Sequence, residues 1–334
     1  MSLLSVKNLH VRLRTDAGLL HAVRGVDLSV EPGQTLCLVG ESGCGKSMTA
    51  LAMLGLLPPS AVWEADEIEI AGTDLRGATQ ATLSSLRGNR VSMIFQEPMT
   101  ALNPTFTIGD QLCAVHRRHR GSGRLEARRR AIYLLERVGI TNARGRLGQY
   151  PHELSGGLRQ RVLIAMALMC EPELIICDEP TTALDVTTQA QILALLAELR
   201  EELGMGMIFI THDLGVVSRI GDHINVMYAG RTVEKGTRDA VLGRAGHPYT
   251  QGLVRSVPRP GKTEKQTPLG TIPGTVPSFY MPDPLCPFRG RCERKTTVCD
   301  QVPPPLVQGM HDGNGAHAIF CHNTQPALTA EIST

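Results

Sequence analysis

The stretch Gly40-Glu-Ser-Gly-Cys-Gly-Lys46-Ser47 decides the fold of this chain, because it matches the pattern G-x-x-x-x-G-K-[ST]. It follows an apolar run over residues 35–39, which predicts a buried strand, and it precedes residues 48–55, which are good helix formers. A strand, a glycine-rich loop and a helix N-terminus place backbone N–H groups against a chain of phosphates. We expect Lys46 to bridge the β- and γ-phosphates and the Ser47 hydroxyl to bind Mg²⁺. The stretch therefore predicts a site for ATP or GTP in preference to a plain glycine turn.

Length and composition predict a globular protein of about two domains. The chain has 334 residues, with 34 Lys and Arg against 32 Asp and Glu, so no global field steers it toward nucleic acid. No apolar run approaches the ~18 residues that a membrane helix needs. The N-terminus lacks the basic and apolar regions of a signal peptide. We therefore expect the chain to stay in the cytosol.

The order of elements predicts an α/β fold. Residues 1–36 alternate with period two and predict an antiparallel β region. Further on, strands are expected at about 63–72, 91–95, 174–177 and 207–210, and helices at 158–170 and 187–202. Residues 105–153 are helical in pattern and rich in arginine. We interpret the seven arginines and two histidines of residues 116–130 as a solvated helix face and not a nucleic-acid site. Alternating strands and helices predict a parallel sheet covered by helices.

Composition also predicts the domain boundaries. An ATPase domain is expected over residues 1–255, with a helical subdomain inserted at about 97–170. Prolines interrupt residues 256–284, and they predict a linker or an extended wrap. Residues 256–334 are therefore expected to form this linker and a small terminal module that carries four cysteines.

Two further motifs carry polar groups suited to a triphosphate. Ser155, Gly156 and Gly157 begin a predicted helix and form a second anion-binding site, able to meet a γ-phosphate. Asp178 and Glu179 end an apolar strand. Asp178 is expected to hold Mg²⁺, and Glu179 to orient and deprotonate the attacking water.

Three more side chains follow in a set order. Gln96, after the strand at 91–95, can reach both the metal and the water. His212, at the end of the strand at 207–210, can contact the γ-phosphate. Asp185 completes the set with Ala183 and Leu184. The residues expected to contact the nucleotide in the first loop are Ser42, Gly43, Cys44, Gly45, Lys46, Ser47 and Met48.

These motifs in this order resemble the nucleotide-binding subunit of an ABC transporter, over residues 1 to about 255. The resemblance implies ATP as the nucleotide and two subunits packed head to tail. Ser155, Gly156 and Gly157 of one chain would close on the ATP held by Lys46 and Ser47 of the other. One chain alone would hydrolyse ATP slowly, and closure would drive a pair of transmembrane subunits between two states.

The sequence departs from this family in two places. The family usually stacks an aromatic ring on adenine near the first strands, where this chain has Leu13, Leu20 and His21. Either His21 stacks on adenine or no ring does, so the preference for adenine rests on the family resemblance. Met48 replaces the Thr or Ser that usually follows Ser47, which leaves only its backbone N–H for the α-phosphate.

Three stretches resemble one subfamily, the importers of dipeptides, oligopeptides and nickel. They are residues 95–104, His247-Pro-Tyr-Thr250 and Cys286-Pro-Phe-Arg-Gly-Arg-Cys292. This resemblance implies two transmembrane permease subunits, a second ATP-binding subunit that is a paralogue, and an extracytoplasmic substrate-binding protein. It also implies a peripheral position on the cytoplasmic face of the cell membrane. The transported substrate is not specified by the sequence.

The tail cysteines Cys286, Cys292, Cys299 and Cys321 suit either zinc or an iron–sulfur cluster. Structural zinc sites usually show short C-x2–4-C pairs, which this spacing lacks. Similar spacing in the ATP-binding subunits of dipeptide permeases implies a [4Fe–4S] cluster. We therefore expect the cluster before zinc, and unliganded thiols third.

Two other functions fit parts of the sequence. A soluble ABC-type ATPase acting on ribosomes or nucleic acid is one, but known forms carry two ATPase cores or a coiled-coil insertion. This chain has a single phosphate loop. A catalytically inactive regulatory subunit is the other, and the presence of Lys46, Glu179 and His212 argues against it.

Overall fold

The computed structural model of the chain describes residues 2–96, 101–182, 184–257, 270–309 and 317–324. Within these residues the chain forms two compact units, each discontinuous in sequence. Unit 1 comprises residues 1–3, 30–34 and 71–208, and unit 2 comprises residues 4–29, 35–70 and 209–334. The tail thus groups with the strands around the phosphate loop and not as a body of its own.

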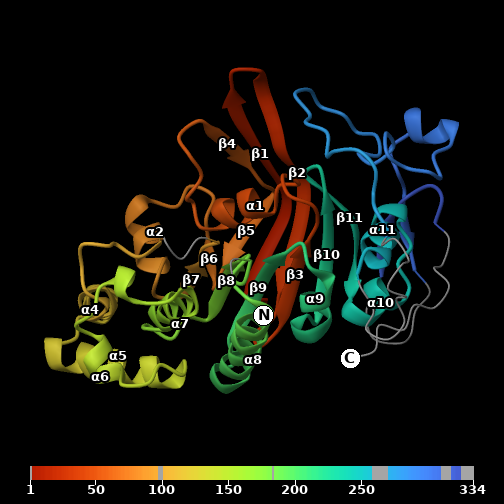
Figure 1. Cartoon of the computed structure of the whole chain (residues 1–334). Helices are drawn as coiled ribbons and strands as arrows, with labels where there is room; N and C mark the ends of the chain where they lie inside the picture. The colour runs from red at the N-terminus through yellow and green to blue at the C-terminus, as the bar shows by residue number, and fades with distance from the viewer. Residues whose placement is uncertain (1, 97–100, 183, 258–269, 310–316, 325–334) are drawn as a thin grey trace. The chain divides into compact units, whose positions relative to one another are not determined.

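The antiparallel region predicted at the N-terminus is confirmed in unit 2 (Figure 1). It consists of β1 (Leu4–Thr15), β2 (Gly18–Val30), β4 (Ala61–Glu64) and β5 (Glu67–Ile70). β1 pairs antiparallel with β4 and β5, and its buried residues alternate as Leu4 and Val6 and then as Leu9 and Val11, with a shift of one residue at Asn8, which has positive φ. Period-two burial on one face is what the sequence pattern predicted.

Unit 2 also contains a mixed sheet, which corrects the prediction of a parallel one. β3 (Thr35–Val39) and β10 (His223–Tyr228) run parallel. β11 (Arg231–Thr237), β13 (Ala318–Phe320) and β12 (Leu306–Gln308) then extend the sheet in antiparallel pairs. The reason is local, because β10 and β11 are joined by Ala229 and Gly230, both at positive φ. Such a two-residue turn forms a hairpin.

Unit 2 also contains four helices and one 3-10 turn among its described residues. They are α1 (Lys46–Met53), α9 (Leu214–Ile220), α10 (Arg238–Gly243), α11 (Pro248–Arg255) and the 3-10 turn η2 (Thr297–Asp300). The predicted strand–loop–helix order around the phosphate loop is confirmed by β3 and α1. No element was predicted for residues 223–237, which form β10 and β11.

Unit 1 holds the helical insertion and two parallel strands (Figure 1). Its elements are β6 (Thr73–Asp74), α2 (Gln80–Leu86), β7 (Val91–Ile94), α4 (Ile108–Arg120), α5 (Arg124–Arg137), α6 (Ala143–Arg146), η1 (Pro151–Glu153), α7 (Gly156–Ala167), β8 (Leu174–Asp178) and α8 (Val186–Leu203). β7 and β8 pair in parallel, as the alternation of elements predicted. β9 (Gly206–Thr211) begins in this unit.

Local sequence explains where these helices begin and end. Thr107 caps α4 by accepting the backbone N–H of Asp110, and Gly121 ends the helix in a left-handed conformation. The predicted helical character of residues 105–153 is confirmed by α4, α5 and α6. Among the described residues, none of the helices is long and apolar enough to span a bilayer.

Candidate nucleotide-binding site

The phosphate loop Gly40–Ser47 joins β3 to α1 and requires glycine at two positions. Gly40 has φ +156°, and a Cβ there would lie 2.2 Å from the Met227 carbonyl oxygen. Gly45 has φ +102°, and its Cβ would lie 2.5 Å from the carbonyl oxygen of Ala22 on β2. Only a residue without a side chain fits these two contacts. The loop is therefore tightly packed against β2 and β10.

Lys46 is buried in the mouth of the loop. Its Nζ donates hydrogen bonds to the carbonyl oxygens of Gly40 at 2.8 Å and Glu41 at 3.1 Å. Ser47 is exposed in the first turn of α1, and Met48 is half-buried. Cys44 points into the core, and burial raises the pKa of its thiol. The Lys46 ammonium is therefore held by carbonyl oxygens of the loop itself, whereas Ser47 is exposed.

In unit 1, Asp178 and Glu179 end the buried strand β8 as predicted. Asp178 is buried, whereas Glu179 is half-buried and has φ +45°, which is unusual for a residue with a side chain. The Glu179 Oε2 atom accepts hydrogen bonds from Gln96 Nε2 at 3.1 Å and Thr182 Oγ1 at 3.0 Å. The structure thus brings Gln96 and Glu179 together. Thr182 is a partner that sequence patterns did not identify.

The segment Ser155–Gly157 begins α7 as predicted. The Ser155 hydroxyl caps the helix by accepting the backbone N–H of Leu158 at 3.4 Å. A Cβ on Gly156 would have no neighbour within 4 Å, whereas one on Gly157 would lie 2.9 Å from Thr188 Cγ2. Packing within the chain explains Gly157. The open space beside Gly156 leaves room for a group from outside the chain.

Asp185 has a structural role that its prediction as a nucleotide ligand did not anticipate. It caps α8 by accepting the backbone N–H and the hydroxyl of Thr188, at 2.9 and 2.8 Å. These hydrogen bonds lower the pKa of its carboxyl. Ala183, which belongs to the same predicted motif, lies outside the described residues.

The two predicted histidines both lie in unit 2. His212 directly follows β9, and its side chain is exposed. His21 is half-buried on β2, beside Ala22, and burial lowers the pKa of its imidazole. Its backbone N–H donates to the carbonyl oxygen of Phe279 in the tail, at 2.8 Å. No sequence pattern pointed to this contact with the tail.

The four tail cysteines gather in unit 2. Burial and the nearby thiols of the other three raise the pKa of Cys286 to about 11, with burial the larger cause. Burial also raises the pKa of Cys292 and Cys321. Across the described parts of the chain, however, no three His, Cys, Asp or Glu side chains converge closely enough to hold a metal ion. The thiols are thus close neighbours without the tight convergence of a single-metal site.

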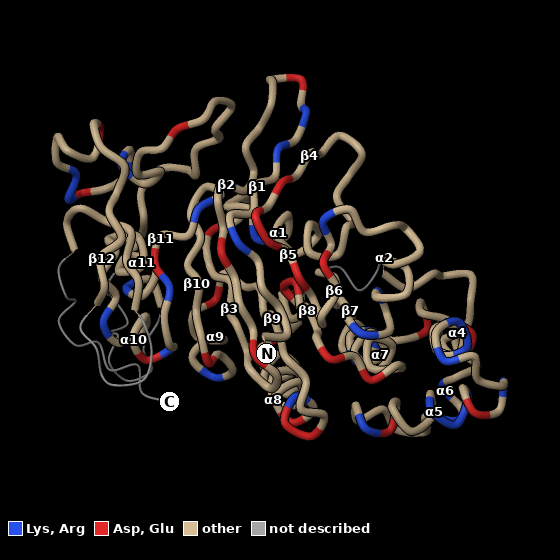
Figure 2. Tube along the Cα trace, turned by 180° about the vertical axis from the view of Figure 1, so that it is seen from behind, with Lys and Arg blue, Asp and Glu red and all other residues tan. Residues whose placement is uncertain are grey.

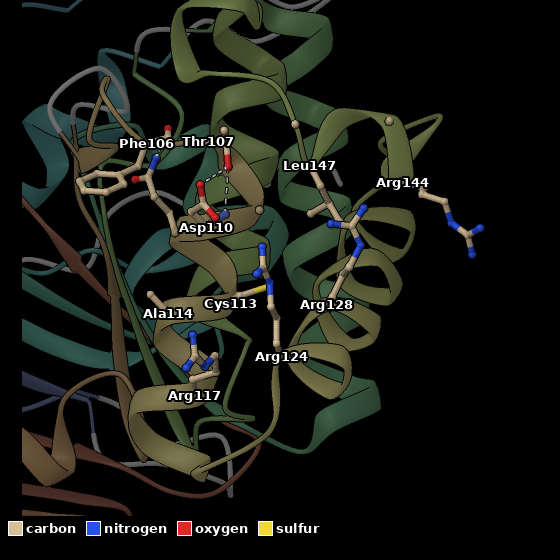
Figure 3. A pocket seen from close by; sticks show the side chains of 14 residues that line it. Phe106, Thr107, Asp110, Cys113, Ala114, Arg117, Arg124, Arg128, Arg144 and Leu147 are labelled. Carbon is tan, nitrogen blue, oxygen red and sulfur yellow. Dashed lines mark hydrogen bonds between the residues drawn. The ribbon is translucent and has the colours of Figure 1, made fainter.

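A cavity of about 770 Å³ lies among α4, α5 and α6 in unit 1 (Figure 3). Its wall includes Arg117, Arg124 and Arg128, and Arg124 extends toward Cys113. Figure 2 shows basic residues repeated along α4 and α5. Asp110 contributes a carboxylate, which accepts the Thr107 hydroxyl at 2.7 Å. The cavity is therefore lined by apolar residues and arginines, with one carboxylate.

Not every basic residue of this region is a solvated surface charge. Arg120 donates to the carbonyl oxygen of Cys170, and Arg130 donates to that of Leu168 at 3.3 Å. His116 is buried and lies 2.6 Å from the Ser122 hydroxyl. The prediction of a solvated face thus holds for only part of residues 116–130, because these three side chains stabilise the insertion itself.

Comparison with known proteins gives matches over most of the chain. The profile of the ABC transporter family matches residues 23–182, and that of the oligopeptide/dipeptide transporter C-terminal region matches residues 233–299. The dipeptide transport ATP-binding protein DppD of Bacillus subtilis is 47% identical, over 95% of this chain and 93% of that protein. The oligopeptide transport ATP-binding protein OppD of Haemophilus influenzae is also 47% identical, over 92% and 94%.

Solved structures agree with these matches. An ATP-binding cassette, solved as a dimer in a post-hydrolysis state with ADP and Pi, is 28% identical with a TM-score of 0.63. The match covers 70% of this chain and 98% of that one. The predicted core fold, with its phosphate loop, β region and inserted helices, is the fold of that cassette.

Proposed function

This chain belongs to the ABC transporter family as an ATP-binding subunit of a peptide importer, and from that premise we propose how it uses ATP. Lys46 and Ser47 hold the phosphates and Mg²⁺ of one nucleotide. Asp178 and Gln96 complete the magnesium site, Glu179 deprotonates the attacking water, and His212 contacts the γ-phosphate. His21 faces the adenine, and its place beside Ala22, which approaches Gly45, supports this assignment.

The arrangement around Glu179 carries this proposal. A carboxylate at the end of a buried strand is held by Gln96 and Thr182, with its backbone in an uncommon conformation. Strained backbone of this kind concentrates at functional sites. A general base must be held so that it can reach a water molecule, and these hydrogen bonds provide that orientation.

Glu179→Gln tests this assignment. Glutamine keeps the shape and the contacts of Glu179 but cannot accept a proton. Turnover by the assembled transporter should fall on the order of 10²–10⁴-fold, and ATP-bound dimers should accumulate. Thr182→Val, which removes only a supporting hydrogen bond, serves as a milder comparison. Turnover that is unchanged in Glu179→Gln would show that another group is the base.

We further propose that two ATP-binding subunits enclose each ATP between them. Ser155, Gly156 and Gly157 of the partner subunit would contact the γ-phosphate held by Lys46. The open space beside Gly156 supports this, because the glycine is not explained by packing within its own chain. The start of a twelve-residue helix also presents free N–H groups to an anion. The second subunit is expected to be a paralogue.

The remaining partners follow from the peptide-importer assignment. We propose two transmembrane permease subunits and an extracytoplasmic binding protein, with this chain attached at the cytoplasmic face of the membrane. The arginine-lined cavity, between α4 and α5, is proposed to seat a cytoplasmic segment of a permease. Its apolar lining residues, its arginines and the exposed Phe106 favour an amphipathic segment with acidic residues.

For the tail, we propose that Cys286, Cys292, Cys299 and Cys321 bind a [4Fe–4S] cluster. A zinc ion would draw all four sulfur atoms to within about 2.3 Å of one point. A four-iron cluster is ligated at its outer corners, so its thiolates stand further apart. The charges of the Cys321, Cys292 and Cys299 thiolates help to raise the pKa of Cys286, and this closeness of the four thiols supports the proposal. The cluster would supply a cross-link that stabilises this segment.

Purification without oxygen tests the cluster. The full chain should show broad visible absorption and about four iron and four sulfide per chain, as the proposed composition requires. Cys299→Ser should lose the absorption, whereas Cys113→Ser, which changes a thiol of the unit 1 cavity, should retain it. Stoichiometric zinc without iron would contradict the proposal.

The alternative, a soluble ATPase acting on ribosomes or nucleic acid, is not favoured. The relatives are named for peptide transport, and the match to the oligopeptide/dipeptide transporter region extends beyond the ATPase core.

A further inference from the structure

The loop between Cys286 and Cys292 reaches the phosphate loop through one arginine. Arg291 Nη1 donates to Glu41 Oε2 at 2.7 Å, and Arg291 Nη2 donates to Glu41 Oε1 at 3.1 Å. Glu41 is the second residue of the Gly40–Ser47 loop. Two parallel charge-assisted hydrogen bonds of this kind fix both distance and orientation. The tail therefore holds a residue of the nucleotide site directly.

Arg291 donates five hydrogen bonds, and only 8% of its side chain is exposed. Its Nε donates to the Pro273 carbonyl oxygen at 2.7 Å and its Nη2 to that of Ile272 at 2.8 Å. Its Nη1 also donates to the Tyr228 hydroxyl at 3.2 Å. These bonds engage all five N–H groups that a guanidinium carries. The geometry is thus more constrained than that of an ordinary surface ion pair, which contributes little.

A cluster of three rings supports the same contact. Phe288, from the cysteine loop, packs edge-on against Tyr228 with ring centroids 5.1 Å apart and lies 5.3 Å from the Tyr249 ring. The Tyr249 hydroxyl accepts the backbone N–H of Glu41 at 2.9 Å. Glu41 is therefore held at its side chain by Arg291 and at its backbone by Tyr249.

The hydrogen bonds that Arg291 and Tyr249 form with Glu41 matter because Glu41 in turn contacts Lys46. Its carbonyl oxygen, with that of Gly40, accepts the Lys46 ammonium. A shift of Glu41 would therefore move both the loop backbone and the resting position of Lys46. The N–H groups of the loop must point at the phosphates before the nucleotide arrives if binding is not to be weakened by reorganisation.

We propose that Arg291 is a positioning residue for ATP, which acts through Glu41 to hold the phosphate loop in its binding conformation. The inference rests on the proposed assignment of Lys46 and Ser47 to ATP. It makes the tail loop 286–292 a part of the support of the nucleotide site, in addition to any cluster that its cysteines hold.

Three variants of the full chain test this, with binding of ATP–Mg²⁺ measured by equilibrium titration. Arg291→Lys keeps the charge but cannot form the paired hydrogen bonds. Glu41→Gln keeps the shape but removes the carboxylate. Each should weaken ATP binding by about 10-fold, the size expected for a charged hydrogen bond. The double variant should be no weaker than either single one, because both remove the same interaction.

Arg289→Lys is the matched control. Arg289 lies in the same loop, but it bonds Asp283 at 2.7 Å and the Cys286 carbonyl oxygen at 3.0 Å, away from the phosphate loop. Its ATP affinity should equal that of the unchanged chain. A purely structural role for Arg291 would instead lower the melting temperature of the nucleotide-free chain equally in both lysine variants, without changing ATP affinity well below that temperature.

Three outcomes are decisive. Unchanged affinity in both Arg291→Lys and Glu41→Gln, or effects that add in the double variant, would overturn the inference. If Arg291→Lys does not fold, Glu41→Gln alone decides, since its partly exposed side chain changes little in size. Lys46→Ala distinguishes failure of the inference about Arg291 from failure of the proposed ATP site. Normal ATP binding by Lys46→Ala would overturn the proposed ATP site itself.

Discussion

At the scale of single residues, Glu179 combines an uncommon backbone conformation with the role of general base that we propose for it. Its positive φ is a conformation that costs on the order of 1–3 kcal/mol for a residue with a side chain. Hydrogen bonds from Gln96 and Thr182 hold the carboxylate there. A sequence pattern identifies the residue, but only the structure shows that its backbone is strained and its oxygen already oriented.

His247, in the His-Pro-Tyr-Thr stretch, determines a pH dependence of stability. It is buried at the N-terminus of α11, where its Nδ1 accepts the Tyr249 backbone N–H at 3.1 Å. Burial lowers the pKa of the imidazole to about 4, with Glu234 opposing the shift. In the unfolded chain the pKa is about 6.5. The unfolded state therefore binds more protons between these values, and the folded state loses stability as the pH falls from about 6.5 toward 4.

The variant His247→Asn tests this. Asparagine can accept the same N–H as a helix cap but does not titrate. The drop in melting temperature between pH 7 and pH 4.5 should be smaller in the variant, because this histidine accounts for about 3 kcal/mol at most over the window. The quantity compared is the change in melting temperature between the two pH values within each protein. A general loss of packing in the variant lowers both melting temperatures and therefore does not affect this change. An equal acid drop in both proteins would contradict the assignment.

At the scale of elements, the sequence predicted those strands and helices whose signals lie close together along the chain. The strands β3, β7, β8 and β9 and the helices α7 and α8 were identified because apolar runs, caps and glycines lie within a few residues of one another. The phosphate loop and the Asp178-Glu179 pair were found for the same reason. Burial in the structure follows these runs closely, since all five residues of β3 and of β8 are buried.

Contacts between distant segments could not be predicted in the same way. β13 pairs with β11 across some eighty residues, and Arg291 meets Glu41 across 250. Glu234 on β11, fully buried, accepts the backbone N–H groups of Gly246 and His247 and lies 2.7 Å from His317 Nε2. In the sequence, nothing marks Arg291, Glu41, Glu234 or His317 as different from other polar residues. Only the fold shows that the tail adds strands to the sheet and contacts the phosphate loop.

At the scale of the whole molecule, the chain must transmit nucleotide binding to membrane partners, and the cavity between α4 and α5 is where we expect this contact. Arg117, Arg124 and Arg128 line it, and the apolar ring of Phe106 is 54% exposed beside them. Opposite charges across an interface mainly raise the rate and the specificity of association. A charge reversal among these arginines should therefore weaken assembly without affecting the nucleotide site.

The variant Arg128→Glu tests this in the assembled transporter. After detergent extraction, the permeases that co-purify with the tagged variant should fall about 10-fold, as expected when like charges face each other across an interface. Arg129→Glu is the matched control, because Arg129 is its exposed neighbour but does not line the cavity. ATP binding by the isolated chain should be unchanged in both. Equal recovery of permeases with the two variants would place the membrane contact on another surface, whereas equal loss would show that net charge, and not this cavity, controls assembly.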